Sequence, residues 1–208
     1  MGVSIYYLAL SEQSTLFKRI QTEKAFSTLF YDLVPYGNGI FHIFDIDKEE
    51  LDEILDWVAE SEEVFDSRAD VDRCLNELCM ELERAETSYP GLADQIAYLE
   101  KSQTLIEELL SQELKKRHLD NCIEYIEKLL YGDRSLAPDL YGEYEDRPLL
   151  VPSSEVQNGA RVLRDIEPEA LFESAGNPDS YYLEHFRRWR DFYLEAAEKG
   201  EAVIIRFT

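Results

Sequence analysis

The sequence predicts a mostly helical α+β domain with a small sheet that includes both ends of the chain. Residues 3–10 read VSIYYLAL and residues 201–208 read EAVIIRFT, and both stretches are rich in residues that favour strands. Much of the chain between them has apolar residues three and four positions apart, as on one face of a helix. Terminal strands with helices between them indicate a sheet on which the helices pack.

Each predicted element follows from a local pattern. Residues 11–34 have the apolar spacing of a helix, PYGNG indicates a turn, and IFHIFDI after it favours a short strand. Asp47 and Glu50 have the spacing of a capping box, which begins the next helix. The remaining helices are expected at 48–61, 69–86, 92–117, 119–131, about 154–164, 168–175 and 179–199, with a loop at 132–152.

The domain organisation predicted from these patterns is simple. The sequence contains no internal repeat and no low-complexity segment that would separate two domains. We therefore expect residues 1–208 to form a single α+β domain. Within it, residues 48–117 are a candidate helical insertion.

The charge of the chain restricts its partners. It has 44 acidic and 21 basic residues, a net charge of −23, and 45% hydrophobic residues, which is enough for a folded core. A folded surface of this charge repels DNA, RNA and anionic membranes. It favours a basic protein partner, although an acidic surface also serves solubility alone.

The compartment is predicted from what the sequence lacks. No apolar run reaches the ~18 residues of a membrane-spanning helix, and the amino terminus lacks the basic region of a signal peptide. The three cysteines are an odd number, which suits a reducing compartment better than a disulfide framework. We expect a soluble, cytoplasmic protein.

The sequence contains no motif for metal binding, cofactor binding or nucleophilic catalysis. His42, His118 and His185 have no second histidine four positions on and no cysteine at zinc-ligand spacing. A phosphate-binding loop and a nucleophile elbow are also missing. We expect no metal and no cofactor, and a non-enzymatic protein is favoured over an enzyme.

The stretch HFRRWRDFY near the carboxy terminus reads as one amphipathic helix. On a helical projection Phe186, Trp189 and Tyr193 share an apolar arc, and Arg188 lies opposite them. Arg190 falls inside the arc. It is interpreted either as a structural arginine paired with a carboxylate from another helix, or as a cleft residue that grips an anionic ligand by its planar fork.

Three blocks in the carboxy-terminal half carry a resemblance to known proteins. They are LDNCIEYIEKLLYG, DRPLLVPSSEVQNGARVL and YYLEHFRRWRDFYLEAAEKGEAVIIRF. In order and spacing they resemble the YfbM-like family of bacterial proteins of unknown function, whose members also begin with Met-Gly and a strand. The resemblance covers residues 119–207 and the first few residues. It implies a single α+β domain, and it implies no catalytic residue because the family has no established activity.

The candidate site residues come from these matched blocks. Ile123 and Glu127 stand where the family has Trp and His, so chemistry shared with the family is in doubt. Glu127 is a candidate for the rim of a cleft near Arg190, and Arg147 is a candidate for its lining.

Two functions are consistent with the sequence. The first is a non-enzymatic protein-binding module, of an inhibitor, immunity or regulatory type, whose acidic face covers a basic protein. The alternative is an enzyme or a binder of a small anionic ligand, with a cleft around Arg190.

Overall fold

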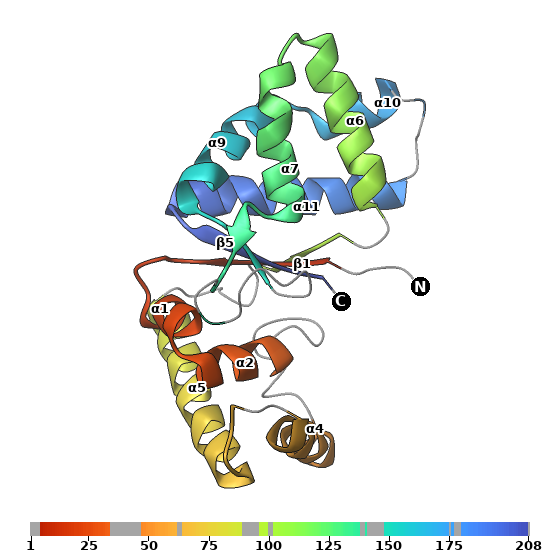
Figure 1. Cartoon of the computed structure of the whole chain (residues 1–208). Coiled ribbons are helices and arrows are strands. Elements are labelled where there is room, and N and C mark those ends of the chain that lie inside the picture. The colour runs from red at the N-terminus through yellow and green to blue at the C-terminus, as the bar shows by residue number, and fades with distance from the viewer. Residues whose placement is uncertain are drawn as a thin grey trace. The chain divides into compact units, whose positions relative to one another are not determined.

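The computed structural model divides the chain into two compact units, which are described separately (Figure 1). Unit 1 comprises Met1–Ser11, Gln95–Leu136 and Glu145–Thr208, and unit 2 comprises Glu12–Asp94 and Ala137–Tyr144. The structure describes residues 5–33, 47–61, 64–88, 96–99, 102–137, 140, 148–174, 176 and 180–207. The insertion at 48–117 stays a prediction, and its last helix belongs to unit 1.

Unit 1 is built on a five-stranded sheet of order β2-β1-β5-β4-β3, in which every neighbouring pair is antiparallel. The terminal strands lie side by side at its centre, which confirms the predicted sheet. The strands are β1 (Ile5–Leu10), β2 (Ile96–Tyr98), β3 (Arg134–Ser135), β4 (Leu149–Val151) and β5 (Ala202–Phe207).

Three short strands correct the predicted elements. β3 and β4 lie in the stretch 132–152 that was predicted as a loop, and β2 lies in the stretch 92–117 that was predicted as helix. These strands have two or three residues, too few to show a period in the sequence. β2 pairs with β1 and β4 pairs with β5, whose backbone groups serve as templates, and β3 pairs in turn with β4. The strand predicted at 40–46 lies outside the described residues.

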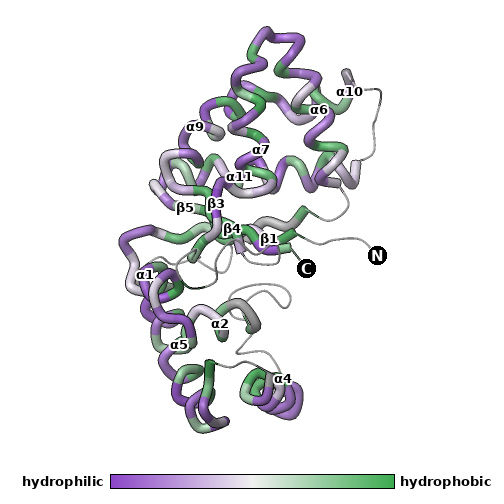
Figure 2. Tube along the Cα trace, in the orientation of Figure 1, coloured by the Kyte–Doolittle hydropathy of each residue, from purple (hydrophilic) through white to green (hydrophobic). Residues whose placement is uncertain are grey.

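The helices of unit 1 cover one face of this sheet (Figure 1). Figure 2 shows hydrophilic and hydrophobic residues alternating around α7, α9 and α11, as expected of helices with one buried side. The helices are α6 (Gln103–Lys116), a 3-10 turn at Asp120–Cys122, α7 (Ile123–Tyr131), α9 (Ser153–Arg164), α10 (Pro168–Ser174) and α11 (Ser180–Lys199).

Two buried tyrosines connect the sheet and α11 to the end of α7. Tyr7 of β1 donates its hydroxyl hydrogen to the carbonyl of Leu130 at 3.0 Å, and Tyr193 of α11 donates to the carbonyl of Leu129 at 2.6 Å. The last carbonyls of a helix have no partner within the helix. The two hydroxyls supply that partner inside the core, so the burial of both rings costs no unsatisfied polar group.

Unit 2 is helical in its described part. Its helices are α1 (Thr15–Thr22), α2 (Lys24–Leu33), α4 (Lys48–Ser61) and α5 (Arg68–Ser88). The helix predicted at 11–34 is two helices, because the backbone at Glu23 is extended between them. Ser14 caps α1 by accepting a hydrogen bond from the Phe17 N–H at 3.1 Å.

The capping residue predicted for the next helix also has its expected place. The carboxylate of Asp47 accepts a hydrogen bond from the Glu49 N–H at 2.8 Å, at the start of α4.

None of the helices in the described ranges has the length and apolar character needed to cross a membrane.

Candidate functional site

The fork of Arg190 binds the end of a neighbouring helix. Its Nε donates to the carbonyl of Leu163 at 3.1 Å, and its Nη2 donates to the carbonyl of Arg164 at 3.3 Å. These are the last carbonyls of α9, which lack partners within the helix. Its Nη1 contacts the carboxylate of the adjacent Asp191 at 3.0 Å. The side chain is 15% exposed, as its position inside the apolar arc suggests.

The other two arginines of α11 make ion pairs at the surface. Arg188 contacts Glu184 at 3.0 Å, and Arg187 pairs with Glu169 of α10. The pairing predicted for Arg190 with a carboxylate from another helix is therefore made by Arg187 instead. Carbonyls at the end of α9 hold Arg190, together with the carboxylate on its own helix.

We expect Arg190→Ala to lower the free energy of unfolding by about 1–2 kcal/mol, since charged hydrogen bonds to two helix-end carbonyls are lost. Arg188→Ala is the matched control on the same helix. Its exposed ion pair should contribute less than about 0.5 kcal/mol. Equilibrium unfolding in urea measures both changes. A larger loss for Arg188→Ala would contradict the orientation of α11.

The remaining candidate residues do not join Arg190 in one site. Glu127 is exposed on α7, and neither a hydrogen bond nor an ion pair joins it to Arg190, although the structure describes both residues. The pKa of Tyr131 is raised, first by burial and then by its hydrogen bond to Glu107 and by the charge of Glu107. The charge of Glu127 contributes to the same increase. Arg147 lies outside the described residues.

The described cysteines and histidines do not form a reactive or metal-binding group, and His42 lies outside the described residues. No cluster of three or more metal-ligating side chains occurs in the described ranges. Burial raises the pKa of Cys74 to about 11 and also raises the pKa of Cys79, so both are protonated thiols near neutral pH. His185 packs on the ring of Tyr181, with centroids 4.4 Å apart.

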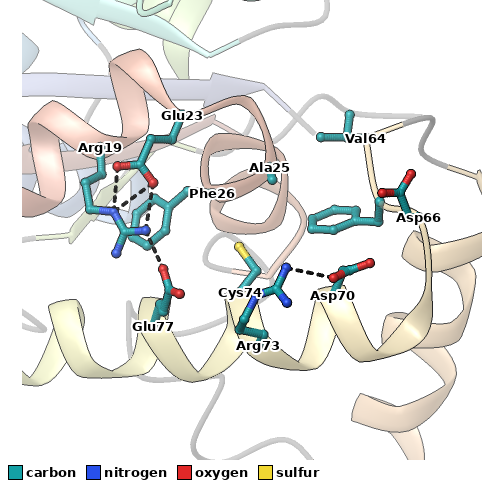
Figure 3. A pocket seen from close by; sticks show the side chains of 11 residues that line it. Arg19, Glu23, Ala25, Phe26, Val64, Asp66, Asp70, Arg73, Cys74 and Glu77 are labelled. Atoms are coloured by element: carbon teal, nitrogen blue, oxygen red, sulfur yellow. Dashed lines mark hydrogen bonds and ion pairs between the residues drawn. The ribbon is translucent and has the colours of Figure 1, made fainter.

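Unit 2 contains a hollow of about 310 Å³, lined by α1, α2, α5 and the segment before α5 (Figure 3). Its apolar lining comes from α2 and α5 and from the residues just before α5: Ala25, Phe26, Val64, Phe65 and Cys74. Its charged lining comprises two guanidinium groups and four carboxylates, those of Arg19, Arg73, Glu23, Asp66, Asp70 and Glu77.

The guanidinium groups of this hollow are engaged by its own carboxylates (Figure 3). Arg19 contacts Glu23 at 2.7 Å and Glu77 at 2.6 Å, and its Cζ lies 4.1 Å from the centroid of Phe26. The hydrogen bonds from Arg19 to these carboxylates raise the pKa of Arg19. Arg73 contacts Asp70 at 2.7 Å. The hollow therefore disfavours an anion, and its protonated thiol is no nucleophile.

The acidic charge of the chain is concentrated in unit 2. Glu12–Asp94 and Ala137–Tyr144 contain 23 acidic and 7 basic residues, a formal net charge of −16 out of −23 for the chain. Unit 1 carries the remaining −7 on a longer stretch of sequence. The sequence shows the total charge directly. It shows the division only when the charges are counted within units whose boundaries come from the fold.

Helix α4 combines this charge with an exposed aromatic ring. Glu49, Glu53 and Glu60 are exposed, and Trp57 is 57% exposed among them. Leu55 and Val58, on the other side of the helix, are buried. Sequence reasoning missed Trp57, because the spacing of apolar residues does not say which of them face the core.

No protein-family model, no curated protein and no solved structure matches this chain. The resemblance of residues 119–207 to the YfbM-like family stays a prediction. The function is therefore argued from the residues of the two units alone.

Proposed function

We propose that this protein is a non-enzymatic binding module whose acidic unit 2 covers a basic protein partner, as inhibitors, immunity proteins and regulatory proteins do. The observation that carries the proposal is the net charge of −16 on unit 2. A surface of one sign steers a partner of the opposite sign and repels nucleic acids and anionic membranes. An enzyme would need a converging set of reactive groups instead.

The acidic helices of unit 2 are held together internally, which supports a preformed surface. Arg68 at the start of α5 donates to the carboxylate of Asp52 at 2.8 Å and to that of Asp72 at 2.9 Å, and it also pairs with Asp56. One guanidinium of α5 thus binds two carboxylates of α4 and one carboxylate of its own helix. A surface that is ordered before binding loses less entropy on association.

The alternative, an enzyme or anionic-ligand binder around Arg190, has less support. All three donor groups of its fork already have acceptors, two of them carbonyls of α9. An anionic ligand would have to displace these contacts, and the carbonyl of Leu163 would keep only its backbone donors, among them the Ile166 N–H at 3.1 Å. No observation on unit 1 favours such a ligand over the structural role.

The proposal predicts that binding depends on the carboxylates of unit 2 and on salt. The full chain should retain a basic protein from lysate of its source cells at about 50 mM salt and release it at about 500 mM, where the Debye length shortens. Neutralising five exposed carboxylates of unit 2 should reduce retention at least about tenfold. The five changes are Glu49→Gln, Glu50→Gln, Glu53→Gln, Glu60→Gln and Asp66→Asn.

The matched control neutralises five exposed carboxylates of unit 1. These are Glu108, Asp120, Glu167, Glu173 and Glu198, each changed to its amide. The control should retain the partner as the unmodified chain does. Retention that survives high salt, or that falls equally in both variants, would contradict the proposed function.

A further inference from the structure

We infer that the partner contacts unit 2 through one face of α4, the acidic stripe of Glu49, Glu53 and Glu60 with Trp57 between the last two, and that this face takes a basic amphipathic helix. The inference rests on the proposed function and names the surface and the chemistry of its partner. It goes beyond charge, because it assigns the anchoring role to one apolar side chain.

The spacing along α4 places these four side chains on one face. Positions 49, 53, 57 and 60 are separated by four, four and three residues, and neighbours at such intervals share a side of a helix. The stripe spans about 16 Å at the rise of an α-helix. That length matches about three turns of a second helix laid along it.

The stripe is exposed because the opposite side of α4 is its buried side. Leu55 and Val58 are 2% and 0% exposed. Arg68 holds α4 from α5 through the carboxylates of Asp52 and Asp56. Trp57 is therefore presented to solvent by a helix whose position is set by other residues.

An indole that is 57% exposed and shares its helix face with exposed carboxylates fits the centre of a protein interface. Tryptophan is enriched among the residues that dominate binding free energy, and polar residues around it exclude water once the contact forms. The carboxylates require cations opposite them, and the indole requires an apolar surface opposite it. A helix with an apolar stripe flanked by lysine or arginine supplies both.

A defined probe tests this face without the natural partner. The probe is a fluorescein-labelled peptide of about 18 leucine and lysine residues, with the leucines at helical spacing. At low salt it should bind the full chain, measured by anisotropy. Trp57→Ala should weaken that binding at least about tenfold, as expected for an anchoring residue.

Met80 provides the matched control, because it is 51% exposed on α5 of the same unit. Met80→Ala should change the affinity for the peptide less than about twofold, the range of a peripheral contact. Tryptophan emission gives a second readout, because Trp189 is fully buried and only Trp57 is accessible. Peptide binding should shift the emission to shorter wavelength, and the shift should be absent in Trp57→Phe.

Each result either supports or overturns the inference that this face of α4 binds a basic amphipathic helix. Peptide binding that is lost in Trp57→Ala and kept in Met80→Ala supports it. No binding, or binding that is equal in both variants with unchanged emission, overturns it. If Trp57→Ala still captures the basic protein from lysate while the variant with five neutralised carboxylates does not, this inference fails and the proposed function stands. If the variant with five neutralised carboxylates also captures the basic protein, the proposed function fails as well.

Discussion

Trp189→Ala should lower the free energy of unfolding by about 3–5 kcal/mol, the range for removing a large aromatic side chain from a core. Trp189 is fully buried on α11 and contacts three aromatic rings. Its centroid lies 5.1 Å from that of Tyr193, 6.1 Å from that of Phe186 and 6.4 Å from that of Tyr7. The cavity would lie beside the two tyrosines that cap α7, so part of the loss would come through their hydrogen bonds.

The second tryptophan of the chain is the control for this prediction. Trp57→Ala removes the same side chain from an exposed position and should change stability by less than about 0.5 kcal/mol. Urea unfolding followed by circular dichroism measures both variants with one signal. Equal losses of stability in the two variants would contradict the burial of Trp189 and the exposure of Trp57.

The carboxy-terminal helix and strand could be predicted because their patterns are long and end in clear signals. The sequence predicts a helix at 179–199 closed by Gly200, and α11 spans Ser180–Lys199. Gly200 has φ 69°, the left-handed conformation that favours glycine at a helix end. The apolar arc of this helix also predicted that Trp189 is buried, which the structure confirms.

The contacts of Arg190 could only be predicted in part. Helical periodicity places Arg190 inside the apolar arc, and this indicates a partner within reach of the core. The partner is a pair of backbone carbonyls at the end of α9, a helix that packs against α11. Which helix end lies beside an arginine depends on tertiary packing, which no local pattern contains.

The division of charge and the exposure of Trp57 depend on the fold in the same way. Unit 2 is assembled from two separate stretches of sequence, so its net charge is not that of any single segment. Within α4, Leu55 and Val58 are buried and Trp57 is exposed, although all three are apolar. The buried side is selected by tertiary packing, in which α5 lies beside α4.

Gly132→Ala should lower the free energy of unfolding by about 3 kcal/mol or more, because two costs add at one position. Gly132 ends α7 with φ 90° and ψ 159°, a backbone conformation that residues with a Cβ rarely adopt, at a cost of about 1–3 kcal/mol. An added Cβ would also lie 2.4 Å from the Cβ of Leu149 in β4. That atom is fixed to the strand backbone, so relief requires movement of β4 itself, at about 1–3 kcal/mol for overpacking.

The surroundings of Gly132 give little room for such a movement. Its N–H donates to the carbonyl of Lys128 at 2.8 Å, and the next N–H, that of Asp133, donates to the carbonyl of Leu150 at 3.0 Å. β4 is in turn paired with β5 at the centre of the sheet.

Gly200→Ala separates the two costs, because Gly200 also has a positive φ but would place its Cβ in open space. It should lose only about 1–2 kcal/mol in the same urea titration. If both variants lost equal stability, the collision with Leu149 would contribute nothing. That result would contradict the close approach of Gly132, at the end of α7, to Leu149 in β4.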